Sequence, residues 1–292
     1  MTIGDAGVPT SRLNHCIGLA LLALVMPGCG GGLPLLHPAH PLPSGVTSLS
    51  AGLGSQWVGG KANREIDAAQ SSTAAGQPVT ALSSAPAVAA ALWSPGLFPW
   101  MSMRLGLGSD SEAGLAYTGR RARIDGRHAL LFGHWALSLG AGAGLGLAHA
   151  SSTNVNGSST FTTSEPIAGL DTSGARAVAF DAPVILGWRS SADIARVWFG
   201  LRPGYEHAYG TLSFTSPTAT LQADINADVM TVGGLVGLAM GLRPIFIAME
   251  LSVAESFAHG SMSGSPGGIA GGSTSLSAMT FTPAAALIWE MR

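Results

Sequence analysis

The chain has 292 residues, of which only 10% are charged, and its formal net charge is −2 at pH 7. This balance, without a basic patch that is interleaved with aromatic residues, argues against nucleic-acid binding. Glycine is abundant, with 41 residues, and no apolar run after residue 30 approaches the roughly twenty residues that a membrane-spanning helix needs. The composition is unusual for a soluble enzyme and suits a barrel whose strands are each weakly hydrophobic.

The amino terminus carries an export signal. Residues 16–26, CIGLALLALVM, form an apolar run of about eleven residues, the length of a signal-peptide core. The junction Gly28-Cys29 follows, and it resembles the lipobox of bacterial lipoproteins, in which the cysteine is acylated and becomes the new amino terminus. An ordinary signal peptide with an incidental cysteine is the alternative.

Cysteine usage fits this interpretation. The two cysteines of the chain are Cys16 and Cys29, so the mature body can form no intramolecular disulfide, although an exported chain would tolerate one. The residues after Cys29 are rich in glycine and proline, which is typical of a tether. We expect a lipoprotein-type signal peptide over 1–28, a lipidated tether over 29–44, and one β-barrel domain over 45–292.

The clearest strand lies at residues 135–147. Its odd positions are all apolar, whereas its even positions are glycine, alanine or serine. Because side chains of a strand alternate between its two faces, one face is apolar and the other nearly bare. A transmembrane β-strand turns the apolar face to lipid and the small or polar face to a lumen.

Similar alternation recurs along the chain. We therefore expect an all-β fold, an antiparallel up-and-down transmembrane β-barrel of about ten strands, within a range of eight to twelve. The expected strands lie at about 45–58, 99–108, 112–119, 121–132, 134–149, 175–189, 193–209, 228–242, 244–258 and 275–291.

The connections between these strands alternate in length. Those near 109–111, 133, 190–192 and 243 are short, which is typical of periplasmic turns. The others, at 59–98, 120, 150–174, 210–227 and 259–274, are long with one exception, and we expect them to be outer loops. Aromatic residues separate in the same way and predict two girdles: Trp135, Trp188 and Trp289 at one end, and Trp57, Tyr117, Tyr205 and Phe257 at the other.

A hairpin carries a resemblance to a known family. A turn over 109–111 would place Leu105 opposite Leu115 and Met103 opposite Tyr117. The run FPWMSMRLGLG over 98–108, then Asp110, Glu112 and GLAY over 114–117, then RIDGR over 123–127, resembles a recurring pattern of bacterial outer-membrane β-barrel proteins. The resemblance implies an outer-membrane location, with outer-membrane lipid and the outer-membrane assembly machinery as partners.

Charged residues share the parity of the glycines and serines, so we expect them to face the lumen. An ionic plug, in which paired charges fill a narrow lumen, is the favoured interpretation, and a polar path for an anionic solute is the alternative. These residues are Arg104, Arg123, Asp125, Arg127, Asp181, Arg196, Arg202, Glu250 and Glu290.

Sites for chemistry are sparse. The eight histidines are scattered without metal-ligand spacing, so we expect no metal and no cofactor. His37 and His40 lie in the expected tether, where solvent would surround them. No small-molecule ligand can be identified.

We expect an outer-membrane lipoprotein, lipid-anchored at Cys29, with a structural, surface-recognition or narrow-pore role and no enzymatic activity. One alternative is a membrane-embedded enzyme that modifies lipid, for which His207 or His149 could form a pair with a loop serine at one rim. Another alternative is a periplasmic β-barrel lipoprotein that binds an apolar ligand. The shared parity of charges and glycines favours an apolar face that points outward to lipid.

Overall fold

The structure is a computed structural model that describes residues 34–75, 84–93, 95–118, 121–146, 167, 169–215, 220–264 and 271–292. The expectations for the signal peptide, for Cys29 and for most of the 150–174 connection lie outside these residues.

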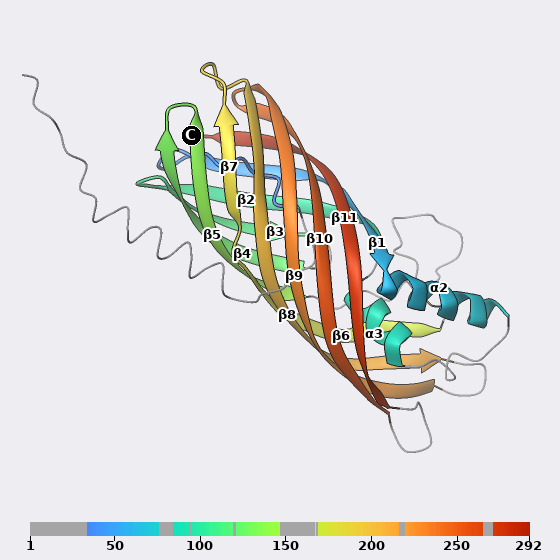
Figure 1. The fold of residues 1–292 in the computed structure, drawn as a ribbon. Coiled ribbons are helices and arrows are strands. Elements are labelled where there is room, and N and C mark those ends of the chain that lie inside the picture. The colour runs from blue at the N-terminus through green and yellow to red at the C-terminus, as the bar shows by residue number, and fades with distance from the viewer. Residues whose placement is uncertain are drawn as a thin grey trace, which may run out of the picture.

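The described residues form eleven strands and two helices (Figure 1). In chain order these are β1 (Thr47–Gly60), α2 (Lys61–Ala74), α3 (Ser84–Leu92), β2 (Gly96–Gly108), β3 (Ser111–Tyr117), β4 (Arg121–Phe132), β5 (Trp135–Gly146), β6 (Leu170–Asp181), β7 (Val184–Arg189), β8 (Ala195–Thr215), β9 (Thr220–Leu242), β10 (Ile245–Gly264) and β11 (Gly272–Met291).

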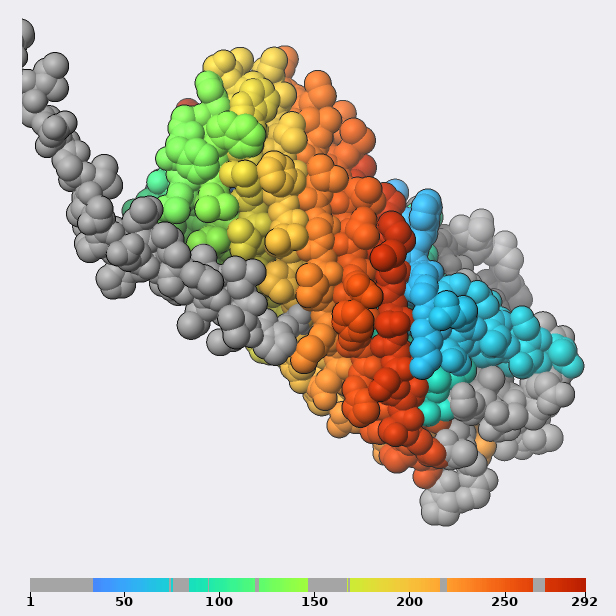
Figure 2. Space-filling view, in the orientation of Figure 1, coloured from blue at the N-terminus to red at the C-terminus, as the bar shows by residue number. Residues whose placement is uncertain are grey.

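The strands form one closed antiparallel barrel. Strand β1 pairs with both β2 and β11, and the circle is completed by pairing of β4 with β5. Figure 2 shows β1 lying beside β11 on the surface. Strands β6 and β7 both pair with β5 and β8, so they are two halves of one strand, interrupted at Ala182-Pro183. Proline lacks the N–H that a continuous ladder needs. The prediction of a ten-stranded antiparallel barrel is confirmed.

The two ends of the barrel differ. At the turn end, which we define by its connections at 109–110, 133–134, 190–194 and 243–244, neighbouring strands are joined by a few residues. At the opposite helix end lie α2 and α3 (Figure 1). The extents predicted for the loops at 210–227 and 259–274 are wrong, because strands β8 to β11 continue through most of both ranges.

These extensions escaped prediction because the polarity of the strand faces reverses along them. On the outer face of β9, alternate residues from Leu242 to Met230 include exposed apolar side chains, whereas Asp228, Asn226 and Asp224 follow towards the helix end. On the inner face of that end, Ile225 and its neighbours are buried in an apolar cluster. The pattern of apolar residues outside and polar residues inside therefore ends in the middle of β9 and is reversed towards the helix end.

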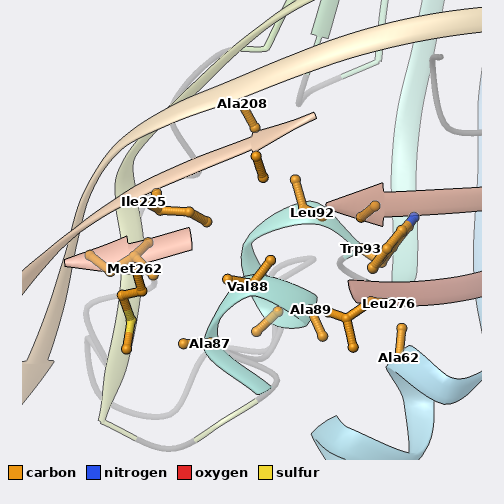
Figure 3. Packing of buried hydrophobic residues seen from close by; sticks show 14 of the residues in the cluster. Ala62, Ala87, Val88, Ala89, Leu92, Trp93, Ala208, Ile225, Met262 and Leu276 are labelled. Carbon is orange, nitrogen blue, oxygen red and sulfur yellow. The ribbon is translucent and has the colours of Figure 1, made fainter. Parts of the chain in front are cut away.

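Helix α3, with the sequence SAPAVAAAL, explains the apolar inner face at the helix end. Ala87 to Ala90 are fully buried. Figure 3 shows Val88 and Leu92 pointing towards inward side chains of the strands, among them Ile225. A helix that is apolar on every side must be surrounded by protein. Neither helix of the described ranges is long and apolar enough to cross a membrane.

The hairpin of β2 and β3 has a different register from the predicted one. Gly108 pairs with Ser111, and the two intervening residues, Ser109 and Asp110, both have positive φ, at 49° and 55°. Met103 therefore lies opposite Leu115, not opposite Tyr117. The error is two residues, which leaves every side chain on its predicted face because the faces alternate with period two.

The reversal of polarity can be tested on adjacent residues of β9. We expect Ile225→Asp to destabilise the barrel by about 3–5 kcal/mol, because it buries an unpaired carboxylate beside α3. Asn226→Asp, which adds the same charge on the outer face, should leave the melting temperature nearly unchanged. Thermal melts of the two purified variants measure the difference, and equal melting temperatures would contradict the assigned faces.

The lumen as candidate functional site

All nine charged residues predicted to face the lumen lie on inner-face positions of the barrel wall. Eight of them form ion pairs, and the side chain of each of these eight is at most 9% exposed. The ninth, Glu250, is 3% exposed. Inside the barrel they divide into two clusters and one isolated carboxylate. Ion pairs hold the two clusters in place, whereas hydrogen bonds from the backbone and from Trp198 hold the carboxylate of Glu250.

The larger cluster is a chain of alternating charges. The guanidinium of Arg104 contacts Glu112 and lies 2.5 Å from Asp125 Oδ1. Arg123 contacts Asp125 and places Nη2 2.6 Å from Asp181 Oδ1. Arg202 reaches the other oxygen of Asp181 at 2.7 Å. Every charge of this chain therefore has at least one opposite neighbour.

Glycines in the wall make room for these arginines. A Cβ on Gly142 would lie 2.4 Å from the guanidinium of Arg123, and one on Gly114 would lie 2.6 Å from that of Arg104. The wall is thus free of side chains where a guanidinium lies across it. The bare face of β5, which the sequence shows as repeated glycine, is the surface that accommodates Arg123.

The smaller cluster lies at the turn end. Arg196 donates to Glu290 at 2.5 Å and to Asp193 at 2.8 Å, and it also lies over the ring of Phe246. Arg243 donates to the same Asp193 at 2.7 Å. Burial tends to raise the pKa of Asp193, but the hydrogen bonds and charge of Arg196, together with the charge of Arg243, lower it below its usual value.

Residues 34–46 precede β1, and we call this stretch the amino-terminal plug; residues 34–40 are buried in the lumen, whereas 43–45 are exposed. Glu250 accepts hydrogen bonds from the backbone N–H groups of Leu35 and Leu36, at 2.7 and 2.9 Å, and from Trp198 Nε1 at 2.9 Å. The plug and Trp198 thus occupy both oxygens of Glu250.

Arg127 links the plug to the wall. Its Nη2 lies 2.9 Å from Glu112 Oε2, and its Nη1 lies 2.8 Å from His37 Nδ1 and also donates to the carbonyl of Pro38. The carbonyl of His40 accepts a further hydrogen bond, at 3.3 Å. Arg127 therefore donates hydrogen bonds both to the carboxylate of Glu112 and to backbone carbonyls of the plug.

The expectation that solvent surrounds His37 and His40 is wrong. They are 5% and 6% exposed, and their neighbours Leu36 and Ala39 are almost completely buried. A segment with prolines at 34, 38, 41 and 43 cannot join a sheet along its length, since proline has no N–H to donate. Its backbone groups are satisfied by lumen side chains instead.

Sequence reasoning missed several partners. Glu112 is 1% exposed and pairs with two arginines, and Arg121 pairs with Glu206 from a strand that is not its neighbour. Glu112 shares the parity of Arg104 within the hairpin, which was the available signal. For the plug, the signal in the sequence is the apolar pair Leu35 and Leu36, which a solvated tether would leave exposed.

A small cavity lies beside the plug. A cavity of about 20 Å³ remains beside His37, Arg104, Arg127 and Arg196, which is room for about one water molecule. Within the described part of the chain, no group of histidine, cysteine and acidic side chains could hold a metal ion. The charged side chains that line this part of the lumen are paired with one another or with the plug.

Comparisons with known proteins give only distant structural similarity. No protein-family model and no curated protein matches the chain. Among solved structures, the outer-membrane protease OmpT from Escherichia coli is 8% identical with a TM-score of 0.44, covering 85% of this chain and 97% of OmpT. Ail, the attachment invasion locus protein of Yersinia pestis, is 10% identical with a TM-score of 0.27, covering 84% and 99%. The toluene transporter TodX of Pseudomonas putida is 9% identical with a TM-score of 0.27, covering 85% and 90%.

The role of Arg127 can be tested by truncation. We expect Arg127→Ala to lower the free energy of unfolding by about 3–5 kcal/mol, because it leaves Glu112 buried with one partner fewer and frees the backbone of the plug. Arg176→Ala is the control, since Arg176 is exposed and donates to the nearby carbonyls of Ser173 and Ala175. If thermal melts show the same small loss for both variants, Arg127 does not hold the plug.

Proposed function

We propose that the barrel spans the bacterial outer membrane, with its turn end in the periplasm and its helix end outside. A belt of exposed apolar side chains on the outer face supports this placement, among them Ile124, Leu201 and Met249, which are 62%, 57% and 54% exposed. Glu255 is exposed on the outer face between Val253 and Phe257, whereas the paired arginines and acids of the same part of the wall point inward, as lipid contact favours. Outer-membrane lipid and the assembly machinery of that membrane are the partners that this placement implies.

Aromatic residues at both edges of the belt support the same placement. Trp135 pairs directly with Trp188 near the turn end, where Trp289 is half exposed. Trp57 and Phe257 lie nearer the helix end and are 64% and 52% exposed. Tryptophan and other aromatic residues favour the boundary between lipid and water.

We infer that the protein acts as a closed barrel, with a structural or surface-recognition role, and does not serve as an open pore. Two independent obstructions of the lumen carry this inference. The plug and the ion pairs lie in the half at the turn end, and α3 with its apolar cluster lies in the half at the helix end. A barrel that binds an apolar ligand would need an apolar cavity, whereas the cavity beside the plug is small and has Arg104, Arg127 and Glu112 in its lining.

We also propose that Cys29 is acylated, from the Gly28-Cys29 junction after an apolar core. Pro34 lies five positions after Cys29, so the acyl group would lie at most about 18 Å along the chain from the plug. Such an anchor would oppose loss of the plug from the barrel. The mass of the mature amino-terminal peptide tests the modification, and an unmodified start elsewhere would exclude it.

The membrane placement predicts a dependence on depth for an introduced arginine. Leu251→Arg places a cation on the outer face within the apolar belt, where the expected cost is about 2–4 kcal/mol. Ser261→Arg lies on the same face of β10 beyond the belt, so it should assemble like the wild type. The yield of folded protein in the outer-membrane fraction measures both, and equal yields would contradict the placement.

The closed lumen predicts that purified protein in a planar lipid bilayer carries no steady current. An open porin measured in the same bilayers is the positive control. The arginines inside the wall would favour anions if a continuous path existed. A steady, anion-selective current from the wild-type protein would therefore show that the lumen is open and would overturn the closed-barrel proposal.

A further inference from the structure

Four polar side chains with complementary chemistry lie in one row on the outer face of the barrel. His207 of β8 pairs with Asp228 of β9 in the strand register, Asp228 pairs with His259 of β10, and His259 pairs with Ser275 of β11. The row lies towards the helix end from the apolar belt, because the preceding outer-face residues on β9 and β10 are Met230 and Phe257. It is separate from the lumen.

The contacts within this row pair a nucleophile with a base. Ser275 Oγ lies 3.0 Å from His259 Nδ1, and both residues are exposed. A hydroxyl oxygen at hydrogen-bond distance from an imidazole nitrogen is the arrangement from which histidine can remove the proton of serine.

Two further charges accompany this pair. Asp228 lies on the strand beside His259, and its carboxylate accepts hydrogen bonds from Tyr205 at 2.5 Å and from His207 Nδ1 at 2.9 Å. On the other side, Lys61 Nζ lies 2.7 Å from the backbone oxygen of Ser275. A carboxylate can stabilise an imidazolium, and an ammonium can stabilise an oxyanion.

We propose that this row is a hydrolytic site for a carboxylic ester, with Ser275 as nucleophile and His259 as general base. Ser275 Oγ bonds to the carbonyl carbon while its proton moves to His259 Nδ1, and the negative charge on the carbonyl oxygen is met by Lys61. Collapse breaks the bond between the carbonyl carbon and the alkoxy oxygen, and His259 returns the proton to that oxygen. Water then hydrolyses the acyl-serine by the same path and releases the free acid.

The substrate is an acyl ester of lipid in the outer leaflet. Phe257, which is 52% exposed, lies two residues from His259 on the same face of β10, so the site adjoins the surface that contacts lipid. The ammonium of Lys61 favours an anionic headgroup. This assignment rests on the membrane placement proposed above, but it does not depend on whether the lumen is closed.

The test uses the full protein in mixed micelles that contain an anionic diacyl phospholipid. We expect the wild type to release fatty acid, and Ser275→Ala and His259→Gln to reduce the rate by about 100-fold or more. A fluorophosphonate probe should label the wild type on Ser275, as mass spectrometry of the labelled peptide would show. Ser273→Ala is the matched control, because Ser273 lies on the same face of β11 opposite Ser261.

The measurements distinguish a loss of hydrolysis from a loss of folding or of the closed lumen. All substituted side chains are exposed, so the melting temperatures and the bilayer currents of the variants should match those of the wild type. Ser273→Ala should keep the full rate of release. The absence of fatty-acid release and of labelling in the wild type would overturn the proposal, as would an unchanged rate in Ser275→Ala.

Discussion

Charge inside a closed sheet is the constraint on which this structure depends. A barrel wall uses all its backbone hydrogen bonds between neighbouring strands, so a charged side chain in the lumen must find its partner among other side chains, the plug or trapped water. The alternating chain from Glu112 to Arg202 meets this requirement across strands far apart in sequence. Removing one member leaves a buried charge that its remaining neighbours do not balance.

The amino-terminal plug follows from the same constraint. Glu250 and Arg127 present a carboxylate and a guanidinium to the lumen, and the plug offers backbone N–H groups to the first and carbonyl groups to the second. A proline-rich segment is well suited to this role, because it has few donors that would compete for strand pairing. The wall and the plug thus complete one another's hydrogen bonding.

At the helix end the distribution of polar and apolar side chains is reversed. There the inner face packs on α3, as a soluble core would, and the outer face carries polar side chains. The barrel is therefore two environments in series, a charged interior within an apolar belt and an apolar interior within a polar surface. This division makes the outer surface of the helix end, which includes His259 and Ser275, the polar part of the barrel's exterior.

An antiparallel barrel of about ten strands could be predicted from the sequence, because period-two alternation is a local property that each strand displays alone. The faces of the strands that carry the arginines and acids could be predicted in the same way. The partners of these residues, such as Glu112 for Arg127 and the plug for Glu250, could not be predicted, because the pairing depends on the register and curvature of the closed sheet. The plug and α3 could not be found from alternation, since they form no strand, and their burial is set by a lumen that exists only after the barrel closes.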